Sequence, residues 1–199
     1  AASDVYKRQE KVDQVTYDVT MPFIRMMAGN VDYTQGAMRN AVKKDFRDIY
    51  SSPMSQGTRC HQLATYIVFD SPLVMLCDAP TAYRKEPECT RFIAGLPVVA
   101  DETRILQGKM GEYIVTARRV GEDWIVGGLT DWEARTVDLD LSFLPEGMFR
   151  AEIFCDGINA DKKGEDYRHE YRDVKREDRL KMQLAPGGGF AIRLKKNHN

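Results

Sequence analysis

The residues of this chain best suited to chemistry follow an apolar segment near its start. Residues Tyr17–Met27 are largely apolar, Gly29 allows a turn, and Asp32 and Tyr33 come directly afterwards. If the segment is a barrel strand, these side chains lie at the end where barrel enzymes build their sites. A carboxylate accepts hydrogen bonds from hydroxyl groups, and an aromatic ring stacks on the apolar face of a sugar. We therefore predict Asp32 and Tyr33 as substrate contacts; the alternative is a turn in which Asp32 caps backbone N–H groups.

Three further polar residues stand in apolar surroundings. Asp78 ends the run Leu73–Cys77 and is a third candidate substrate contact, with a plain Asp-Ala-Pro turn as the alternative. Arg25 lies within the first apolar segment, and a buried arginine must be paired. We expect it to bridge neighbouring elements; the alternative is that it orients a catalytic carboxylate. His61 is expected to be a hydrogen-bonded packing residue of a helix rather than a metal ligand.

The sequence contains no recognisable metal or phosphate motif. Four cysteines have no CxxC spacing and no histidines at ligand intervals, so we expect free, mostly buried thiols. The run Gly187–Gly189 is followed by strand-like residues rather than Lys-Ser/Thr, which indicates a tight turn. We assign no metal ligand to this chain.

Composition narrows the class of protein. The 199 residues are 43% hydrophobic and 30% charged, with a net charge of −1 and the two signs interspersed. This balance argues against partners such as nucleic acid or an anionic membrane surface. The longest apolar runs, Ala64–Phe69 and Pro72–Cys77, are far shorter than the roughly 20 residues that cross a bilayer. No secretory signal is recognisable in the chain.

The first half alternates between predicted strands and helices. We predict a short strand within Ala28–Ala37, a helix over Ser55–Phe69 with Ser55 as its N-cap, a buried strand at Leu73–Cys77, and a helix over Glu86–Leu96. The segment Tyr17–Met27 is either extended or helical, since its proline suits the first turn of a helix. This order is typical of β/α units.

The second half changes to period-two patterns separated by turns. Residues 157–178 between two of the predicted strands are charged, and we interpret them as a surface excursion. At least six short strands indicate an antiparallel β-sandwich. We divide the chain into a non-native or disordered leader (1–14), an α/β part (15–100) and an all-β sandwich domain (101–199). The predicted strands are Glu112–Arg119, Trp124–Leu129, Thr136–Phe143, Phe149–Asp156, Leu180–Leu184 and Gly189–Leu194.

Several separated segments carry a family resemblance in the same order: Asp18–Met38, Ser55–Pro80, Glu86–Pro97, Trp124–Leu144, Asp156–Asp161 and Ala185–Leu194. Together they resemble glycoside hydrolase family 97, and the match runs from Val15 to Lys196. One departure is Asn30, where the family commonly has proline. Family members have a (β/α)8 barrel between two β-domains. The resemblance therefore implies that this chain contains the last β/α units of the barrel and the C-terminal antiparallel β-sandwich.

The resemblance also implies an activity and places its chemistry elsewhere. The family's α-glucosidases and α-galactosidases hydrolyse α-glycosidic bonds of oligosaccharides, are periplasmic or secreted, and use calcium. Their calcium ligands and catalytic carboxylates precede the segment that matches Asp18, in part within a Glu-Gly-x-x-Gly-x-Glu signature that this chain lacks. We therefore expect a C-terminal portion that is inactive alone and that needs the preceding part of the same enzyme as its partner.

A binding module without catalysis is the alternative function. Such a sandwich recognises carbohydrate through exposed, coplanar aromatic rings. The candidates for that role are Trp132, Tyr167 and Tyr171.

Overall fold

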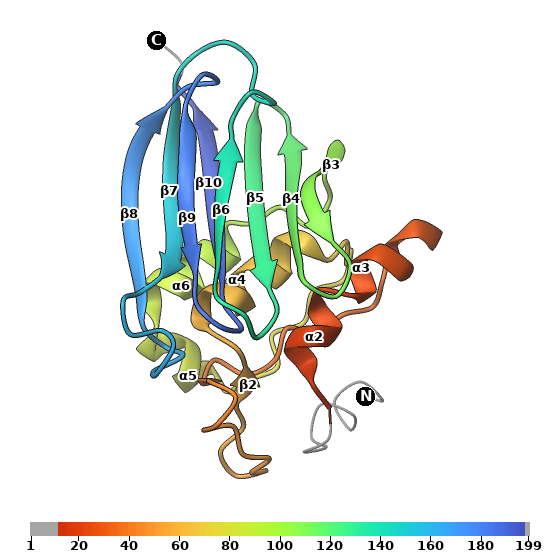
Figure 1. The fold of residues 1–199 in the computed structure, drawn as a ribbon, viewed down its shortest axis with the longest axis vertical. Helices are drawn as coiled ribbons and strands as arrows, with labels where there is room; N and C mark the ends of the chain where they lie inside the picture. Colours follow the sequence, from red (N-terminus) through yellow and green to blue (C-terminus); the bar gives the residue numbers. More distant parts are fainter. Residues whose placement is uncertain (1–11, 198–199) are drawn as a thin grey trace.

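Two antiparallel sheets form the β part of the molecule in the computed structural model, which describes residues 12–197 (Figure 1). The larger sheet has six strands in the order β3-β4-β5-β10-β7-β8, and the smaller pairs β6 with β9. The strands of the large sheet are β3 (Glu102–Lys109), β4 (Tyr113–Val120), β5 (Asp123–Thr130), β10 (Gly189–Lys196), β7 (Phe149–Asp156) and β8 (Tyr167–Val174). Those of the small sheet are β6 (Arg135–Asp140) and β9 (Arg179–Leu184).

The main hydrophobic core lies between these two sheets. Along β9 buried and exposed residues alternate strictly, so that Leu180, Met182 and Leu184 face the large sheet. Leu139 of β6 and Trp124 of β5 belong to the same buried cluster. The predicted antiparallel sandwich of the second half is therefore confirmed.

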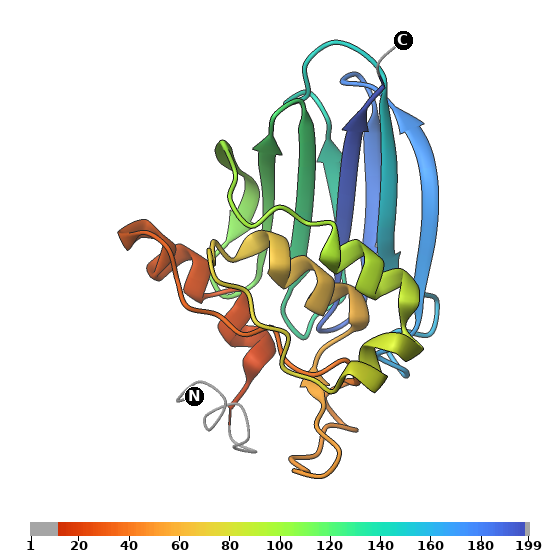
Figure 2. The ribbon, with the colours of Figure 1, turned by 180° about the vertical axis from the view of Figure 1, so that it is seen from behind.

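Helices cover the opposite face of the large sheet (Figure 2). The central one, α4, contacts β5, β10 and β4, and a short parallel pair of strands precedes it. The remaining elements are α2 (Gln14–Asp18), α3 (Met21–Ile24), the 3-10 turn η1 (Met26–Ala28), β1 (Asn40–Ala41), β2 (Ser55–Gln56), α4 (Arg59–Val68), α5 (Pro80–Lys85) and α6 (Pro87–Ala94).

Every residue of α4 is buried, because the helix has neighbours on both sides. One side packs on the large sheet, where Gly127 leaves room for Ile67 and for the carbonyl of Ala64. The other side lies under two extended segments, 29–39 and 70–79, that run side by side (Figure 2). A hydrogen bond from Val31 N to Asp70 O, 2.9 Å long, joins these segments.

The structure corrects several predictions in the first half. Residues Leu73–Cys77 are irregular rather than a buried strand, and Leu73 is 72% exposed. No strand forms within Ala28–Ala37. Of the two alternatives for Tyr17–Met27 the helical one is observed, so this segment is not the barrel strand on which the placement of Asp32 and Tyr33 relied. These runs were assigned by apolar composition alone, yet a strand also needs a neighbouring strand to satisfy its backbone. Helix α4 begins at Arg59, four residues after the predicted start.

Two strands of the large sheet were not predicted. Residues 157–178 are not simply an excursion, because they contain β8 at one sheet edge. The opposite edge strand, β3, was also missed. Most residues of each edge strand are exposed to solvent, so neither sequence shows the alternation of apolar and polar residues that is typical of a half-buried strand.

The architecture is thus mostly antiparallel β-structure with a few helices. Hydrophobic contacts run from one half of the chain to the other: Leu63 and Phe92 share a buried cluster with Ile125, Phe154 and Ala191. Helix α4 is therefore held by the same sheet that forms the sandwich.

The close approach of α4 to β5 makes a testable prediction. A Cβ at Gly127 would lie 2.9 Å from Ile67 Cβ and 3.0 Å from Ala64 O. Because neither atom can move without shifting the helix, Gly127→Ala should lower the free energy of unfolding by about 1–3 kcal/mol, measured by urea denaturation.

Gly108→Ala on β3 is the matched control. A Cβ at Gly108 would meet Phe23 Cζ at 2.8 Å, which is the far end of a rotatable side chain. We expect a loss clearly smaller than that of Gly127→Ala, and equal losses would contradict the packing argument.

Candidate functional site

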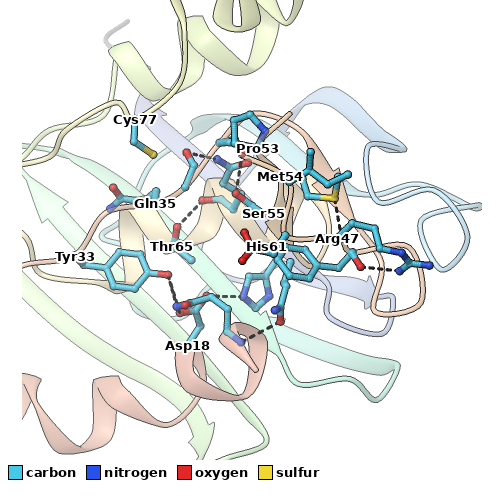
Figure 3. Close-up of a pocket in the computed structure, with 18 of the residues that line it drawn as sticks. Asp18, Tyr33, Gln35, Arg47, Pro53, Met54, Ser55, His61, Thr65 and Cys77 are labelled. Atoms are coloured by element: carbon cyan, nitrogen blue, oxygen red, sulfur yellow. Dashed lines mark hydrogen bonds and ion pairs between the residues drawn. The ribbon is translucent and has the colours of Figure 1, made fainter. Parts of the chain in front are cut away.

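A cavity of about 380 Å³ opens beside the first half of α4 (Figure 3). Its walls come from α2, from the extended segment that carries Tyr33, and from the loop over residues 42–54. The loop is held by its own contacts: Arg47 donates to the carbonyls of Lys44 and Phe46 at 2.8 and 2.7 Å. Side chains that line the cavity include Asp18, Tyr33, Gln35, Ser55, Gln56, His61, Gln62 and Thr65.

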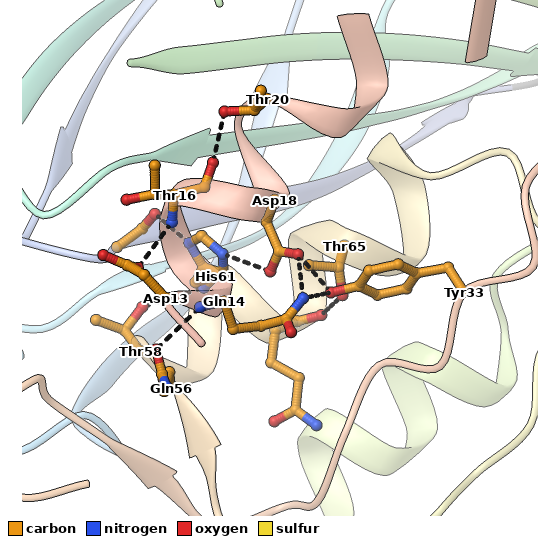
Figure 4. Close-up of polar contacts among 12 residues, drawn as sticks. Asp13, Gln14, Thr16, Asp18, Thr20, Tyr33, Gln56, Thr58, His61 and Thr65 are labelled. Carbon is orange, nitrogen blue, oxygen red and sulfur yellow. Dashed lines mark hydrogen bonds and ion pairs between the residues drawn. The ribbon is translucent and has the colours of Figure 1, made fainter. Parts of the chain in front are cut away.

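Asp18 is the centre of a buried polar network at one wall of this cavity (Figure 4). Its Oδ1 accepts hydrogen bonds from the Tyr33 hydroxyl at 2.7 Å and from Gln14 Nε2 at 2.8 Å. Its Oδ2 lies 3.1 Å from His61 Nε2. Burial, followed by the negative charge of Asp18, raises the pKa of Tyr33 well above its ordinary value, so Tyr33 remains a donor. Asp18 is thereby committed to holding α2 against α4.

The partners of His61 fix the roles of its two ring nitrogens. Nδ1 lies 3.1 Å from the carbonyl oxygen of Gly188, which only accepts, so Nδ1 carries a hydrogen. Nε2 shares the remaining contact with Asp18. Both nitrogens are therefore occupied, and no hydroxyl or thiol of the described residues is hydrogen-bonded to the ring. The pair lacks the nucleophile of a catalytic triad. The prediction that His61 is a hydrogen-bonded packing residue is confirmed.

A second carboxylate, that of Asp156, lies at the start of α4. It accepts hydrogen bonds from Thr58 Oγ1 at 2.7 Å and from the backbone N–H groups of Ala185 and Gly189 at 2.8 and 3.0 Å. Burial raises its pKa to about 6, although these donors and the nearby His61 act in the opposite direction. Thr58 is at the same time the N-cap of α4, accepting from His61 N at 3.0 Å.

Arg59 is one of two buried arginines among the described residues, the other being Arg118. The Arg59 side chain is 1% exposed, and it donates to Asn40 Oδ1 and to Met38 O, both at 2.5 Å. Glu86 and Glu165 provide its negative charges at 3.4 and 3.9 Å. The prediction of a buried bridging role for Arg25 is wrong, because Arg25 is exposed in the described structure. The rule used for Arg25 applies equally to Arg59, the first residue of a helix in which every residue is buried.

The three predicted substrate contacts are not brought together at one surface. Asp32 is exposed, whereas Tyr33 is buried and its ring stacks on Phe69 at 3.8 Å between centroids. Asp78 accepts from Met38 N and Ala79 N at 2.8 and 2.7 Å, as a capping residue does. Tyr33 lines the cavity, but Phe69 covers one face of its ring. Their roles toward substrate stay predictions.

The aromatic residues suggested as a sugar platform have other partners. Trp132 Nε1 donates to Asp13 at 2.7 Å, and the Tyr167 hydroxyl donates to Glu88 at 3.0 Å. Tyr171 is 52% exposed, and its hydroxyl donates to Glu152 at 3.0 Å. No flat row of free rings results on the described surface.

The described residues show neither a metal cluster nor a spanning helix. No three His, Cys, Asp or Glu side chains between residues 12 and 197 are grouped to hold an ion. Cys60, Cys89 and Cys155 are buried free thiols and Cys77 is exposed, in agreement with the mostly buried thiols expected from their spacing. Within the same range, no helix has the length and apolarity to cross a bilayer.

Comparison with known proteins gives consistent matches. Residues 99–195 match the family model described as glycosyl-hydrolase 97 C-terminal, oligomerisation. The chain is 58% identical to a retaining alpha-galactosidase of Bacteroides thetaiotaomicron over 184 residues, which are 92% of its length. It is 27% identical over 183 residues to a probable retaining alpha-galactosidase of Streptomyces bingchenggensis, again over 92% of the chain. The chain spans 28% and 26% of the lengths of these two relatives.

The fold is likewise similar to that of a solved enzyme. A glycoside hydrolase family 97 enzyme from Pseudoalteromonas sp. strain K8, in complex with acarbose, superposes with a TM-score of 0.84 at 34% sequence identity. That match covers 92% of this chain and 29% of the other.

The Asp18 network predicts that Tyr33 stabilises the fold through its hydroxyl. Tyr33→Phe keeps the ring stacked on Phe69 but removes the bond to the buried carboxylate, so we expect a loss of about 1–3 kcal/mol in the free energy of unfolding. Tyr66→Phe in α4 is the control, because the buried Tyr66 hydroxyl has no hydrogen-bond partner among the described residues. Its removal should be neutral or stabilising. A Tyr66→Phe loss as large as that of Tyr33→Phe would contradict the assignment.

The raised pKa of Asp156 predicts a pH dependence of opposite sign to that of a salt-bridged carboxylate. The folded state binds this proton more tightly than the unfolded chain, so folding loses stability as pH rises from about 4 to about 6. Asp156→Asn removes this loss. Relative to wild type, the variant should gain up to about 3 kcal/mol between pH 4 and pH 7, measured by urea unfolding at each pH. Parallel profiles for the two proteins would show that Asp156 titrates normally.

Proposed function

Because the chain belongs to glycoside hydrolase family 97 and corresponds to the C-terminal part of its members, we propose that it completes a retaining α-galactosidase. In this proposal the intact protein hydrolyses the α-galactosidic bonds of oligosaccharides. The observation that carries the choice of α-galactoside over α-glucoside is the 58% identity to the Bacteroides enzyme over 92% of this chain.

The site geometry supports an incomplete active centre in this part of the enzyme. Retaining hydrolysis needs two carboxyl groups about 5 Å apart, one as nucleophile and one as acid. Asp18 already accepts hydrogen bonds from Gln14 and Tyr33 and contacts His61 Nε2, and the other carboxylate that lines the cavity, Asp48, is exposed on the loop over residues 42–54. We propose that the reacting carboxylates come from the preceding part of the protein and that this chain alone is inactive.

An apolar surface on the helical side is the proposed contact with that preceding part. Leu73 and Met27 are 72% and 86% exposed, and Met75 and Ile24 are each 53% exposed. Gln35 adds a polar signal: it is buried and lines the cavity, yet neither atom of its amide has a hydrogen-bond partner among the described residues. Buried amides are normally paired. We propose that the upstream part of a (β/α)8 barrel covers this surface, so that residues 15–100 act as the last units of the barrel.

Calcium and cellular location follow the same proposal. The calcium ions expected from the resemblance would be held by ligands of the preceding part, and the whole protein would be periplasmic or secreted. For residues 99–195 we propose self-association, in line with the description of the matching family model.

A chimera tests the proposed activity. Residues 15–196 would replace the corresponding segment of the Bacteroides thetaiotaomicron enzyme, and hydrolysis of an aryl α-galactoside would be followed by absorbance. We expect activity within about tenfold of the parent enzyme, because 58% identity leaves most contacts between the parts unchanged. NMR of the first-formed sugar should show retained anomeric configuration.

The purified 199-residue chain is the control, and it should release no product above a buffer blank. Two results would contradict the proposal: hydrolysis by the chain alone, or a folded chimera that prefers aryl α-glucosides.

A further inference from the structure

The two edges of the large sheet differ in their suitability for pairing with another strand. Edge strand β3 has a β-bulge between Ile105 and Gln107, where its register with β4 shifts. A bulge twists an edge away and hinders further pairing. Edge strand β8 pairs with β7 in unbroken register over eight residues, from Tyr167 to Val174. Within the described structure no other element is hydrogen-bonded to its outer side, and both ribbon views show it outermost (Figures 1 and 2).

On one face of β8, residues of opposite charge follow each other, so that two antiparallel copies of the strand have complementary charges. Glu170 and Arg172 point to the sandwich face, because they lie opposite Ile153 and Ala151 of β7, two members of the inter-sheet core. Tyr171 points to the helical face and is 52% exposed. Arg172 makes no ion pair with any residue between 12 and 197, while Glu170 has a single exposed contact, to Arg168 at 3.4 Å.

We propose that β8 is the surface through which a second copy of this chain binds, by antiparallel pairing of the two β8 strands about a two-fold axis at Tyr171. This inference rests on the proposed self-association of residues 99–195 and names its surface. In this register Glu170 of each copy lies opposite Arg172 of the other, and the two Tyr171 rings meet on the helical face. The two six-stranded sheets become one continuous sheet.

The register is chosen by the surroundings of the strand. The beginning of β8 already has partners within the chain. The Tyr167 hydroxyl donates to Glu88 of α6, and Gly164 O, in the loop before β8, accepts from Arg59 N. An axis at Tyr171 keeps the paired residues within 168–174, beyond those contacts. It also gives Arg172 an acidic partner, and Glu170 can accept from two arginines because a carboxylate has four lone-pair sites. Such a contact is isologous, as in most two-fold dimers.

Charge reversal tests both the surface and the register. In Glu170→Arg the two arginines face each other at two symmetric positions, and in Arg172→Glu the two glutamates do so. By sedimentation velocity of the whole chain over a range of concentrations, we expect each variant to dimerise about tenfold or more weakly than wild type, since like charges directly opposite are destabilising.

Mixing the two variants is the decisive step. An E170R chain opposite an R172E chain has opposite charges at both positions, so the mixture should form a heterodimer within about threefold of the wild-type affinity, as should the double variant E170R/R172E. Lys181→Glu on β9 makes the same change of charge as R172E away from the edge and should leave dimerisation unchanged. Circular dichroism spectra confirm that each variant is folded.

The outcomes separate this inference from the proposal beneath it. A wild-type chain that remains monomeric at all concentrations contradicts self-association itself. A dimer that persists in both single variants, or single variants that do not recover on mixing, overturns the β8 surface while leaving self-association in place.

Discussion

The first turn of α4 is the constraint on which the rest of the structure depends. Thr58 N donates to Gly187 O at 2.9 Å, and Arg59 N donates to Gly164 O at 2.7 Å. The first N–H groups of a helix have no partners within the helix, and here loops of the sandwich supply them. The Arg59 guanidinium then binds the segment before β1 and the junction of α5 with α6. One buried cation thus joins parts of the chain that are far apart in sequence. Breaking such a buried pair leaves an uncompensated charge, at a cost of about 3–5 kcal/mol.

This arrangement explains why the helical layer and the sandwich form one hydrogen-bonded unit. Asp156 of β7 and His61 of α4 each reach into the turn before β10, through Gly189 N and Gly188 O respectively. The helix cannot leave the sheet without exposing these bonds together with its fully buried apolar surface. The tight turn at Gly187–Gly189, a motif without apparent chemistry in the sequence, therefore has a structural role. Its carbonyls accept hydrogen bonds from Thr58 N and His61 Nδ1 at the helix start, and Gly189 N donates to Asp156.

The sequence was sufficient to predict elements in which buried and exposed residues alternate regularly. Strand β9 alternates strictly between buried and exposed residues and was predicted almost to its ends, and α6 was located by Pro87 in its first turn. Edge strand β8 was missed because a solvent-exposed edge strand has no regular spacing of apolar residues. The strand predicted at Leu73–Cys77 was wrong because apolar composition does not reveal whether a partner strand is present. The Asp18–His61 contact spans 43 residues, and no local pattern connects its ends.

Polar and apolar groups are distributed differently on the two sides of α4. On the sheet side, the charge of Asp156 close to the helix start has partners inside the chain. On the opposite side, segment 70–79 presents apolar side chains to solvent and Gln35 is buried without a partner among the described residues. A surface that evolved to face water would reverse this pattern, because exposed apolar clusters and unpaired buried amides are both unfavourable. The sheet side is therefore a satisfied interior, and the outer side of the helical layer has the character of a contact surface.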